Sequence, residues 1–317
     1  MYYHTTVARY LCPMKEGNQP NISLGILLAV AATIIWSGNF IVARAVMHTI
    51  PPVTLAFFRW TTAVVLLTPI AWKHIKPAWQ IVKENKAYFF WTGLTGVSLF
   101  NTFVYIAGHS STAINLALIG TTSSPIMSVL LASVFLKEPI SWRRLSGMLL
   151  CMAGILFLLS KGVFQNLLHL EFNKGDAWVL LGALSFAIYN IFTRKRPAAI
   201  SALGFLFFVF LIGAVMLFPA YVIEAAYEAP VQWSMQTVLV ILYLGAGASV
   251  LSFLFWNRSI KELGAGRTSL FGNLIPIFST MEAVAILGEK ISYIHIVSFL
   301  LIAAGLAIDN STLLKRT

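Results

Sequence analysis

Polar and aromatic side chains recur at helical spacing inside strongly apolar stretches of this sequence. Between residues 88 and 108, Asn101 and Tyr105 are four positions apart, and Ser252 and Trp256 repeat that spacing between residues 237 and 257. Residues three, four or seven positions apart share one face of a helix. Donors, acceptors and rings on one face can orient a small organic solute, so we interpret these residues as binding residues. Hydrogen bonding between helices is the alternative.

Neighbouring apolar stretches carry side chains of the same kinds. The predicted solute-binding residues are Trp36, Asn39, Asn101, Tyr105, Asn115, Thr122, Tyr189, Asn190, Ser252, Trp256, Asn273 and Thr280. The tryptophans have a second interpretation as anchors at the membrane interface. Two prolines, Pro125 and Pro276, lack the N–H that an intact helix needs. We predict that they act as hinges, with static kinks that only shape packing as the alternative.

Two charged residues lie deep inside apolar stretches. A charge in the membrane interior is costly, so such a residue is by default a candidate for a functional role. Glu282 lies six residues before the end of the stretch 266–288, and Arg59 lies eight residues into the stretch 52–72. We predict Glu282 as the candidate proton carrier. At about 1.5 Å per residue the two charges have a similar depth, so an ion pair between them and ordinary packing of Glu282 are the alternatives.

The composition requires a lipid environment for these stretches. Of 317 residues, 58% are apolar and 10% are charged, whereas about a quarter of the residues in soluble domains are charged. A span of hydrocarbon needs roughly 20 apolar residues. The sequence predicts ten such spans, at about 22–46, 52–72, 88–108, 112–136, 145–160, 176–193, 200–223, 237–257, 266–288 and 292–309.

The basic residues indicate how these spans are oriented. Seventeen lie in the two tails and the even-numbered gaps, four lie in the odd-numbered gaps, and Arg59 lies within a span. Short basic loops stay in the cytoplasm, which predicts that both termini are cytoplasmic. The net charge of +11 is therefore a signal of topology, and we expect no nucleic-acid partner.

The two halves of the chain resemble each other. A shift of 151 residues places Pro276–Ser292 on Pro125–Ser141 with eight identities in seventeen positions. Five spans are an odd number, so the second repeat must be inverted relative to the first, as in many secondary transporters. The predicted units are a tail (1–21), a first repeat (22–160), a linker (161–174), a second repeat (175–309) and a tail (310–317), with Met1 or Met14 as the start.

Each repeat has a glutamate at the end of its fourth span. Glu138 is expected at the cytoplasmic face, and its counterpart Glu289 is expected at the outer face. We predict that each carboxylate meets the start of the following span, because a helix N-terminus favours a negative charge. A latch that closes a gate is the alternative.

The duplicated pattern resembles a known family. Pro125, Glu138 and Ser141 followed by Ala153-Gly154, with the matching set in the second repeat, are similar to the EamA type of the drug/metabolite transporter superfamily. The stretches "WSGNF" and "FFRW" also resemble its first repeat. This resemblance implies an all-α membrane fold of ten helices in two inverted five-helix repeats. It further implies a central cavity lined by spans 1, 3, 4, 6, 8 and 9, with spans 2, 5, 7 and 10 outside.

The resemblance and the polar faces together predict a transporter of small organic metabolites. We expect export of aromatic or neutral amino acids or related compounds by a multi-pass protein of the bacterial inner membrane, without cofactor or metal. Phosphorylated solutes are disfavoured, because the only deep basic residue, Arg59, lies in a span that is expected outside the cavity. The HExxH pattern and paired deep aspartates that would favour an enzyme are not found in the sequence. An uptake facilitator or exchanger and a lipid-handling protein are the alternatives, and the oligomeric state stays open.

Overall fold

The computed structural model describes residues 21–163, 173–228, 231–264, 267–268 and 271–314, and these residues form helices without strands. Residues 1–20, which include Met14, lie outside the described part. So do 164–172 of the expected linker and 315–317 of the expected C-terminal tail. The all-helical membrane fold expected from the sequence is confirmed.

Seven helical stretches are long and apolar enough to cross a membrane. They are α1 (Ile22–Ala45), α2 (Pro52–Glu84), Lys86–Ala107, α5 (Ala113–Phe135), α8 (Lys174–Arg194), α9 (Ala202–Tyr227) and Met235–Leu263. Shorter apolar helices follow in α6 (Trp142–Leu159), in η3 (Gly272–Leu274) with α13 (Ile275–Leu287), and in α14 (Tyr293–Leu314). The helix α14 thus continues through the first residues of the expected tail.

Two of the long stretches change their helical type in the middle. Lys86–Ala107 consists of α3 (Lys86–Gly93), the π-helical segment η1 (Leu94–Leu99) and α4 (Phe100–Ala107). Met235–Leu263 consists of α10 (Met235–Leu242), the π-helical segment η2 (Tyr243–Leu251) and α11 (Ser252–Leu263). The shift of 151 residues places η1 inside η2, so the two repeats share this irregularity.

Polar side chains fix where several helices begin. The side chain of Asn21 accepts a hydrogen bond from the backbone N–H of Leu24, and Thr112 and Ser201 do the same for α5 and α9. Such N-caps satisfy backbone donors that have no partner within the helix. Glycine ends α11 at Gly264 and α13 at Gly288, both with positive φ, a conformation that only glycine adopts without strain.

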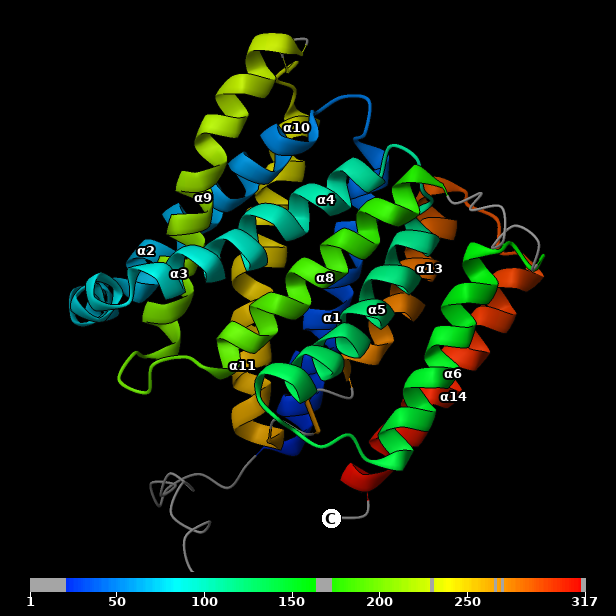
Figure 1. Ribbon diagram of the computed structural model, residues 1–317. Helices are drawn as coiled ribbons and strands as arrows, with labels where there is room; N and C mark the ends of the chain where they lie inside the picture. The colour runs from blue at the N-terminus through cyan, green and yellow to red at the C-terminus, as the bar shows by residue number, and fades with distance from the viewer. Residues whose placement is uncertain (1–20, 164–172, 229–230, 265–266, 269–270, 315–317) are drawn as a thin grey trace, which may run out of the picture.

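Two pairs of repeat-equivalent helices, α2 with α9 and α6 with α14, pack side by side (Figure 1). The pair α2 and α9 flanks one side of the bundle, and the pair α6 and α14 flanks the other. Between these pairs lie α1, α4, α5, α8, α11 and α13. The start of α1 and the end of α14 lie at the same end of the bundle in Figure 1.

Gly154 and Gly305, the glycines of the repeated Ala-Gly pairs, lie where α6 and α14 pack closely against each other. A Cβ atom on Gly305 would lie 2.5 Å from the carbonyl oxygen of Gly147, and one on Gly154 would lie 2.9 Å from that of Ser298. The backbones of α6 and α14 are therefore too close for any side chain at these positions. Small residues allow such close packing where lipid gives no hydrophobic driving force between helices.

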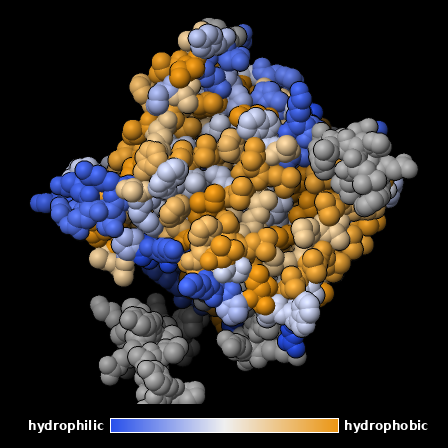
Figure 2. All heavy atoms as spheres, viewed as in Figure 1, coloured by the Kyte–Doolittle hydropathy of each residue, from blue (hydrophilic) through white to orange (hydrophobic). Residues whose placement is uncertain are grey.

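The outer surface is suited to lipid. Figure 2 shows apolar residues across most of the visible face, with polar residues gathered near its margins. Large exposed apolar side chains include Val134, Phe135, Val215, Ile223 and Ile286. A soluble protein rarely exposes so large a contiguous apolar area, so this chain is a multi-pass membrane protein.

Candidate functional site

Arg59 forms the centre of a buried polar network that joins both repeats. Its side chain reaches the interior from α2 and is 4% exposed. Nε donates to Ser249 Oγ of η2 at 2.9 Å, and Nη1 donates to Asn39 Oδ1 of α1 at 2.5 Å. Nη1 also donates to Asn101 Oδ1 and to the Tyr105 hydroxyl of α4, both at 2.7 Å. Three predicted binding residues, Asn39, Asn101 and Tyr105, thus meet at one cation.

The position of Arg59 corrects an expectation from the sequence. Its span was expected outside the cavity, and α2 does pack along α9. Arg59 nevertheless points inward, because η2 approaches α2 so closely that a Cβ on Gly245 would lie 3.0 Å from the Arg59 carbonyl oxygen. The expected position of Arg59 outside the cavity therefore no longer counts against phosphorylated solutes. At the equivalent position of the second repeat, Val209 is fully buried.

The π-helical segments supply partners for this region. Ser249 of η2 accepts the hydrogen bond of Arg59, whereas its counterpart Ser98 of η1 donates to the Gly213 carbonyl oxygen of α9 at 3.0 Å. A π-helical segment inside an α-helix often marks a functional site. In the sequence, only the glycines of "LTGVSL" and "LGAGASVL" indicate these π-helical segments. Hydropathy does not distinguish a π-helical segment from the α-helix around it.

Aromatic rings form a continuous series from Arg59 to the predicted pair Trp36 and Trp256. The guanidinium carbon of Arg59 lies 4.8 Å from the centroid of the Trp60 ring. Successive ring centroids are then 4.5–5.7 Å apart, through Phe210, Phe253, Trp36 and Trp256. Trp60 and Phe210 are buried, whereas Trp36, Phe253 and Trp256 are partly exposed. The open end of the series is therefore the end at Trp36 and Trp256.

A second group of predicted residues lines a different cavity. Thr122 and Pro125 of α5 and Asn190 of α8 border a space of about 380 Å³ that α6 and α14 close on the other side. The Asn190 side chain donates to Ser128 Oγ at 3.1 Å. These residues face the α6–α14 pair, so they lie apart from the Arg59 network.

The remaining predicted residues are dispersed. The Asn115 side chain lies 3.3 Å from His295 Nε2, and the hydroxyls of Ser252 and Thr280 donate to carbonyl oxygens of their own stretches. Tyr189 is buried and packs on Gly96, where a Cβ would meet its ring at 2.2 Å. Asn273 is partly exposed in η3.

The two prolines differ in their structural setting. Pro125 lies inside α5, whereas Pro276 lies in the first turn of α13, directly after the 3-10 segment η3. A missing N–H has little consequence in a first turn. The hinge therefore stays a prediction, and at Pro276 it would depend on the junction between η3 and α13.

Glu282 is held by α1 and does not pair with Arg59. Its Oε1 accepts a hydrogen bond from Ser37 Oγ at 2.7 Å, and its Oε2 is buried without a partner in the described part of the chain. Ser37 and Asn39 are two positions apart on α1, so they point to opposite faces. The expected alternative of an ion pair is wrong, because Arg59 is bonded on the other side of α1.

The two repeat-related glutamates have different partners from those expected. Glu289 does bind a helix N-terminus, but it is that of α5, through the N–H groups of Ala113 and Ile114 at 2.8 and 3.1 Å. Glu138 instead forms a salt bridge of 2.9 Å with Arg194 at the end of α8. Each contact joins one repeat to the other. Its partners lie far apart in the sequence, so local sequence patterns could not predict it.

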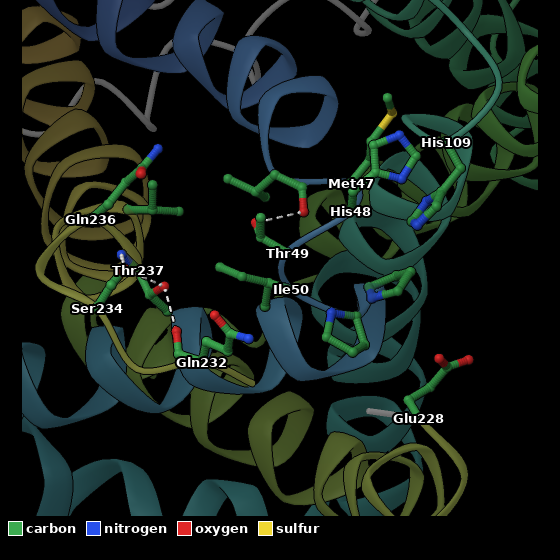
Figure 3. Close-up of a pocket in the computed structure, with 14 residues that line it drawn as sticks. Met47, His48, Thr49, Ile50, His109, Glu228, Gln232, Ser234, Gln236 and Thr237 are labelled. Carbon is green, nitrogen blue, oxygen red and sulfur yellow. Dashed lines mark hydrogen bonds between the residues drawn. The ribbon is translucent and has the colours of Figure 1, made fainter. Parts of the chain in front are cut away.

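A pocket of about 520 Å³ opens at the end of the bundle where the loop between α1 and α2 lies (Figure 3). Its lining includes His48, His109 and Glu228, and Figure 3 shows the two histidines on the same side. His109 lies four residues after Tyr105, in the turn that follows α4. Arg59 does not line this pocket, and the buried Leu55 and Ala56 lie between it and the lining residue Pro52 along α2. Among the described residues, no three His, Cys, Asp or Glu side chains lie close enough together to hold a metal ion.

The family model for EamA-like transporters matches this chain twice, over residues 23–160 and 173–310. The chain belongs to the EamA-like transporter family. The resemblance expected from the duplicated sequence pattern is thereby confirmed.

Relatives of this EamA-like transporter carry transporter names. The uncharacterized transporter YyaM of Bacillus subtilis is 26% identical, over 92% of this chain and 93% of the relative. A "Probable amino-acid metabolite efflux pump" of Salmonella typhimurium is 25% identical, over 89% and 93% of the two chains. A protein of the same name from Escherichia coli is 24% identical. A solved crystal structure at 18% identity shares the fold, with a TM-score of 0.63 over 93% of this chain and 98% of that chain.

Proposed function

We propose that this transporter exports amino acids or closely related small metabolites by alternating access between two inverted repeats. The carrying observation is the Arg59 network, in which side chains of α1, α2, α4 and η2 from both repeats meet at one buried centre. Inverted repeats around a central site are the common plan of secondary transporters. The efflux-pump names of two relatives support the choice of substrate.

The proposed transport cycle depends on residues that differ between equivalent positions of the two repeats. The first repeat carries Arg59 and Tyr105 at this centre, whereas the second repeat carries the buried Val209 and the partly exposed Trp256 at the equivalent positions. A solute would enter beside Trp36 and Trp256 and leave after the network opens. The ten-helix count, the cytoplasmic termini and the placement in a bacterial inner membrane belong to this proposal.

Labelling of single cysteines tests the proposed topology. Ser110 and Lys195 are exposed at opposite ends of the described helices. With cytoplasmic termini, Ser110→Cys reacts with a membrane-impermeant maleimide in intact cells, whereas Lys195→Cys reacts only after permeabilisation. Both native cysteines, Cys12 and the buried Cys151, are replaced by alanine in both variants. The reverse pattern would overturn the proposed orientation.

Flux in proteoliposomes tests export and the role of Glu282. We expect saturable flux of labelled amino acids that an imposed pH gradient drives, and we expect Glu282→Gln to lose that drive while keeping downhill exchange. The reason is that Oε2 is a buried acceptor without a partner, and a proton would satisfy it at little cost. Glu84→Gln, an exposed change of the same kind on α2, is the matched control.

The other outcomes of this assay decide between the alternatives. Saturable flux that ignores the gradient in both proteins identifies a facilitator and leaves Glu282 with a structural role. No flux for any soluble metabolite contradicts the proposal and favours a lipid-handling protein. The single variants Pro125→Ala and Pro276→Ala test the predicted hinges. Unchanged flux in both variants would contradict a hinge role for these prolines.

A further inference from the structure

Arg59 is a buried cation without an anionic partner. Its hydrogen-bond acceptors are two amide oxygens and two hydroxyl oxygens, all of them neutral. It is the only buried basic side chain among the described residues. A charge inside a membrane protein is normally paired, because neutral acceptors only partly replace its hydration. The network therefore lacks one negative charge.

Two donor groups beside this charge, Arg59 Nη2 and Trp60 Nε1, are also unused. A guanidinium group has five N–H donors, and those on Nη2 have no hydrogen-bond partner among the residues that the structure describes. The adjacent Trp60 is 3% exposed, and its Nε1 is buried without an acceptor. A buried donor without an acceptor is costly. An anion bound to Arg59 would supply the missing negative charge and acceptors for Nη2.

We propose that Arg59 binds the carboxylate of the transported solute. This inference rests on the proposed function and deepens it, because it assigns the chemical group that the site recognises. The aromatic series from Trp60 to Trp36 and Trp256 places an apolar surface next to the cation. The recognised solute is then a carboxylate that carries an apolar or aromatic group.

The site favours a carboxylate over a phosphate ester. A guanidinium group and a carboxylate neutralise each other with matching bidentate geometry. A phosphate dianion would need a second cation, and no other buried basic side chain is present among the described residues. The carboxylate of Glu282 is held by Ser37, on the opposite face of α1 from Asn39.

Asn101→Asp tests the proposal with a variant that keeps the network intact. The new carboxylate would lie at the position of Asn101 Oδ1, 2.7 Å from Nη1, and would supply the missing charge internally. We expect a higher melting temperature than that of the wild type and at least a tenfold weaker affinity for carboxylates. Gln80→Glu makes the same chemical change at an exposed position of α2 and should leave both values unchanged.

Four probes identify the recognised group by calorimetric titration of the purified protein. They are L-phenylalanine, phenylpropionate, which lacks the amine, L-phenylalaninamide, which lacks the carboxylate, and phenyl phosphate. We expect the two carboxylates to bind at least tenfold more tightly than the amide and the phosphate ester, and this preference to disappear in Asn101→Asp and Arg59→Gln. Equal affinity for the amide, preference for the phosphate, or no binding to the wild type would each overturn the assignment.

Flux of the same probes separates this inference from the proposed function. If the wild type transports phenylalanine and its amide equally well, the transporter proposal stands and the carboxylate assignment fails. If carboxylates bind with the expected preference but no probe is transported, the assignment stands and the export proposal fails. Undiminished carboxylate binding in Asn101→Asp overturns the assignment even where Arg59→Gln fails to fold.

Discussion

Replacing Glu289 with alanine is expected to destabilise the protein by about 3 kcal/mol, because hydrogen bonds to charged groups contribute about 1.5–3 kcal/mol each. The carboxylate receives two such bonds from the N–H groups of Ala113 and Ile114 at the start of α5. Without it, these donors have no partner within their helix. Thermal unfolding in detergent should show a melting temperature that is lower by several degrees.

Glu138→Ala is the matched control for this prediction, because repeat symmetry places Glu138 at the equivalent position. Its salt bridge to Arg194 joins side chains that are 44% and 43% exposed, and such surface pairs contribute about 0–1 kcal/mol. We therefore expect a clearly smaller loss of stability for Glu138→Ala. Equal losses for both variants would show that capping of α5 does not stabilise the fold.

The broken symmetry around Arg59 has a functional consequence. Two inverted repeats with the same residues would form two equivalent gates. Here Arg59, Asn101 and Tyr105 correspond to Val209, Ser252 and Trp256 in the second repeat. In the proposed alternating access, one gate would be closed by a charged network and the other by aromatic packing, so the two closed states would differ in energy. A bound carboxylate would stabilise the centre of the charged gate specifically.

Hydropathy was sufficient to predict the helical stretches, whereas the pairing of α2 with α9 and of α6 with α14 was not predicted. Long apolar runs have few alternatives to helices in a membrane, and the duplicated Ala-Gly pairs correspond to a close contact between α6 and α14. The helix α2 extends beyond the predicted membrane span of about 52–72 and ends at Glu84. A helix continues past the hydrocarbon when the residues that follow, such as Lys73 and Lys76, also favour helix.

The candidate site was predictable only in part. Asn39, Asn101 and Tyr105 were found because polar residues at helical spacing stand out against an apolar background. Their common partner Arg59 was not assigned to the interior, because the rotation of α2 about its axis depends on packing against η2. The bond from Glu289 to α5 spans 176 positions in sequence, and no local pattern encodes a contact of that range.

The close contact between α1 and α4 gives the second large effect, expected for Gly108→Ala. A Cβ at this position would lie 2.2 Å from the carbonyl oxygen of Ala43 and 2.7 Å from its carbonyl carbon. Both are backbone atoms, so relief requires the helices to separate, and overpacking of this kind costs about 1–3 kcal/mol or more. Separation would also move Asn39 away from Tyr105, whose hydroxyl donates to it at 3.0 Å.

We therefore expect Gly108→Ala to lower both the melting temperature and the affinity for the solute. Gly272→Ala is the matched control, since its nearest neighbour would be Trp256 Cη2 at 3.8 Å, an ordinary contact that should change stability by about 0.5 kcal/mol at most. A fall in stability with unchanged affinity would show that the Arg59 network tolerates movement of α1. Unchanged stability would contradict the close packing itself, because no rearrangement of side chains can make room between two backbones.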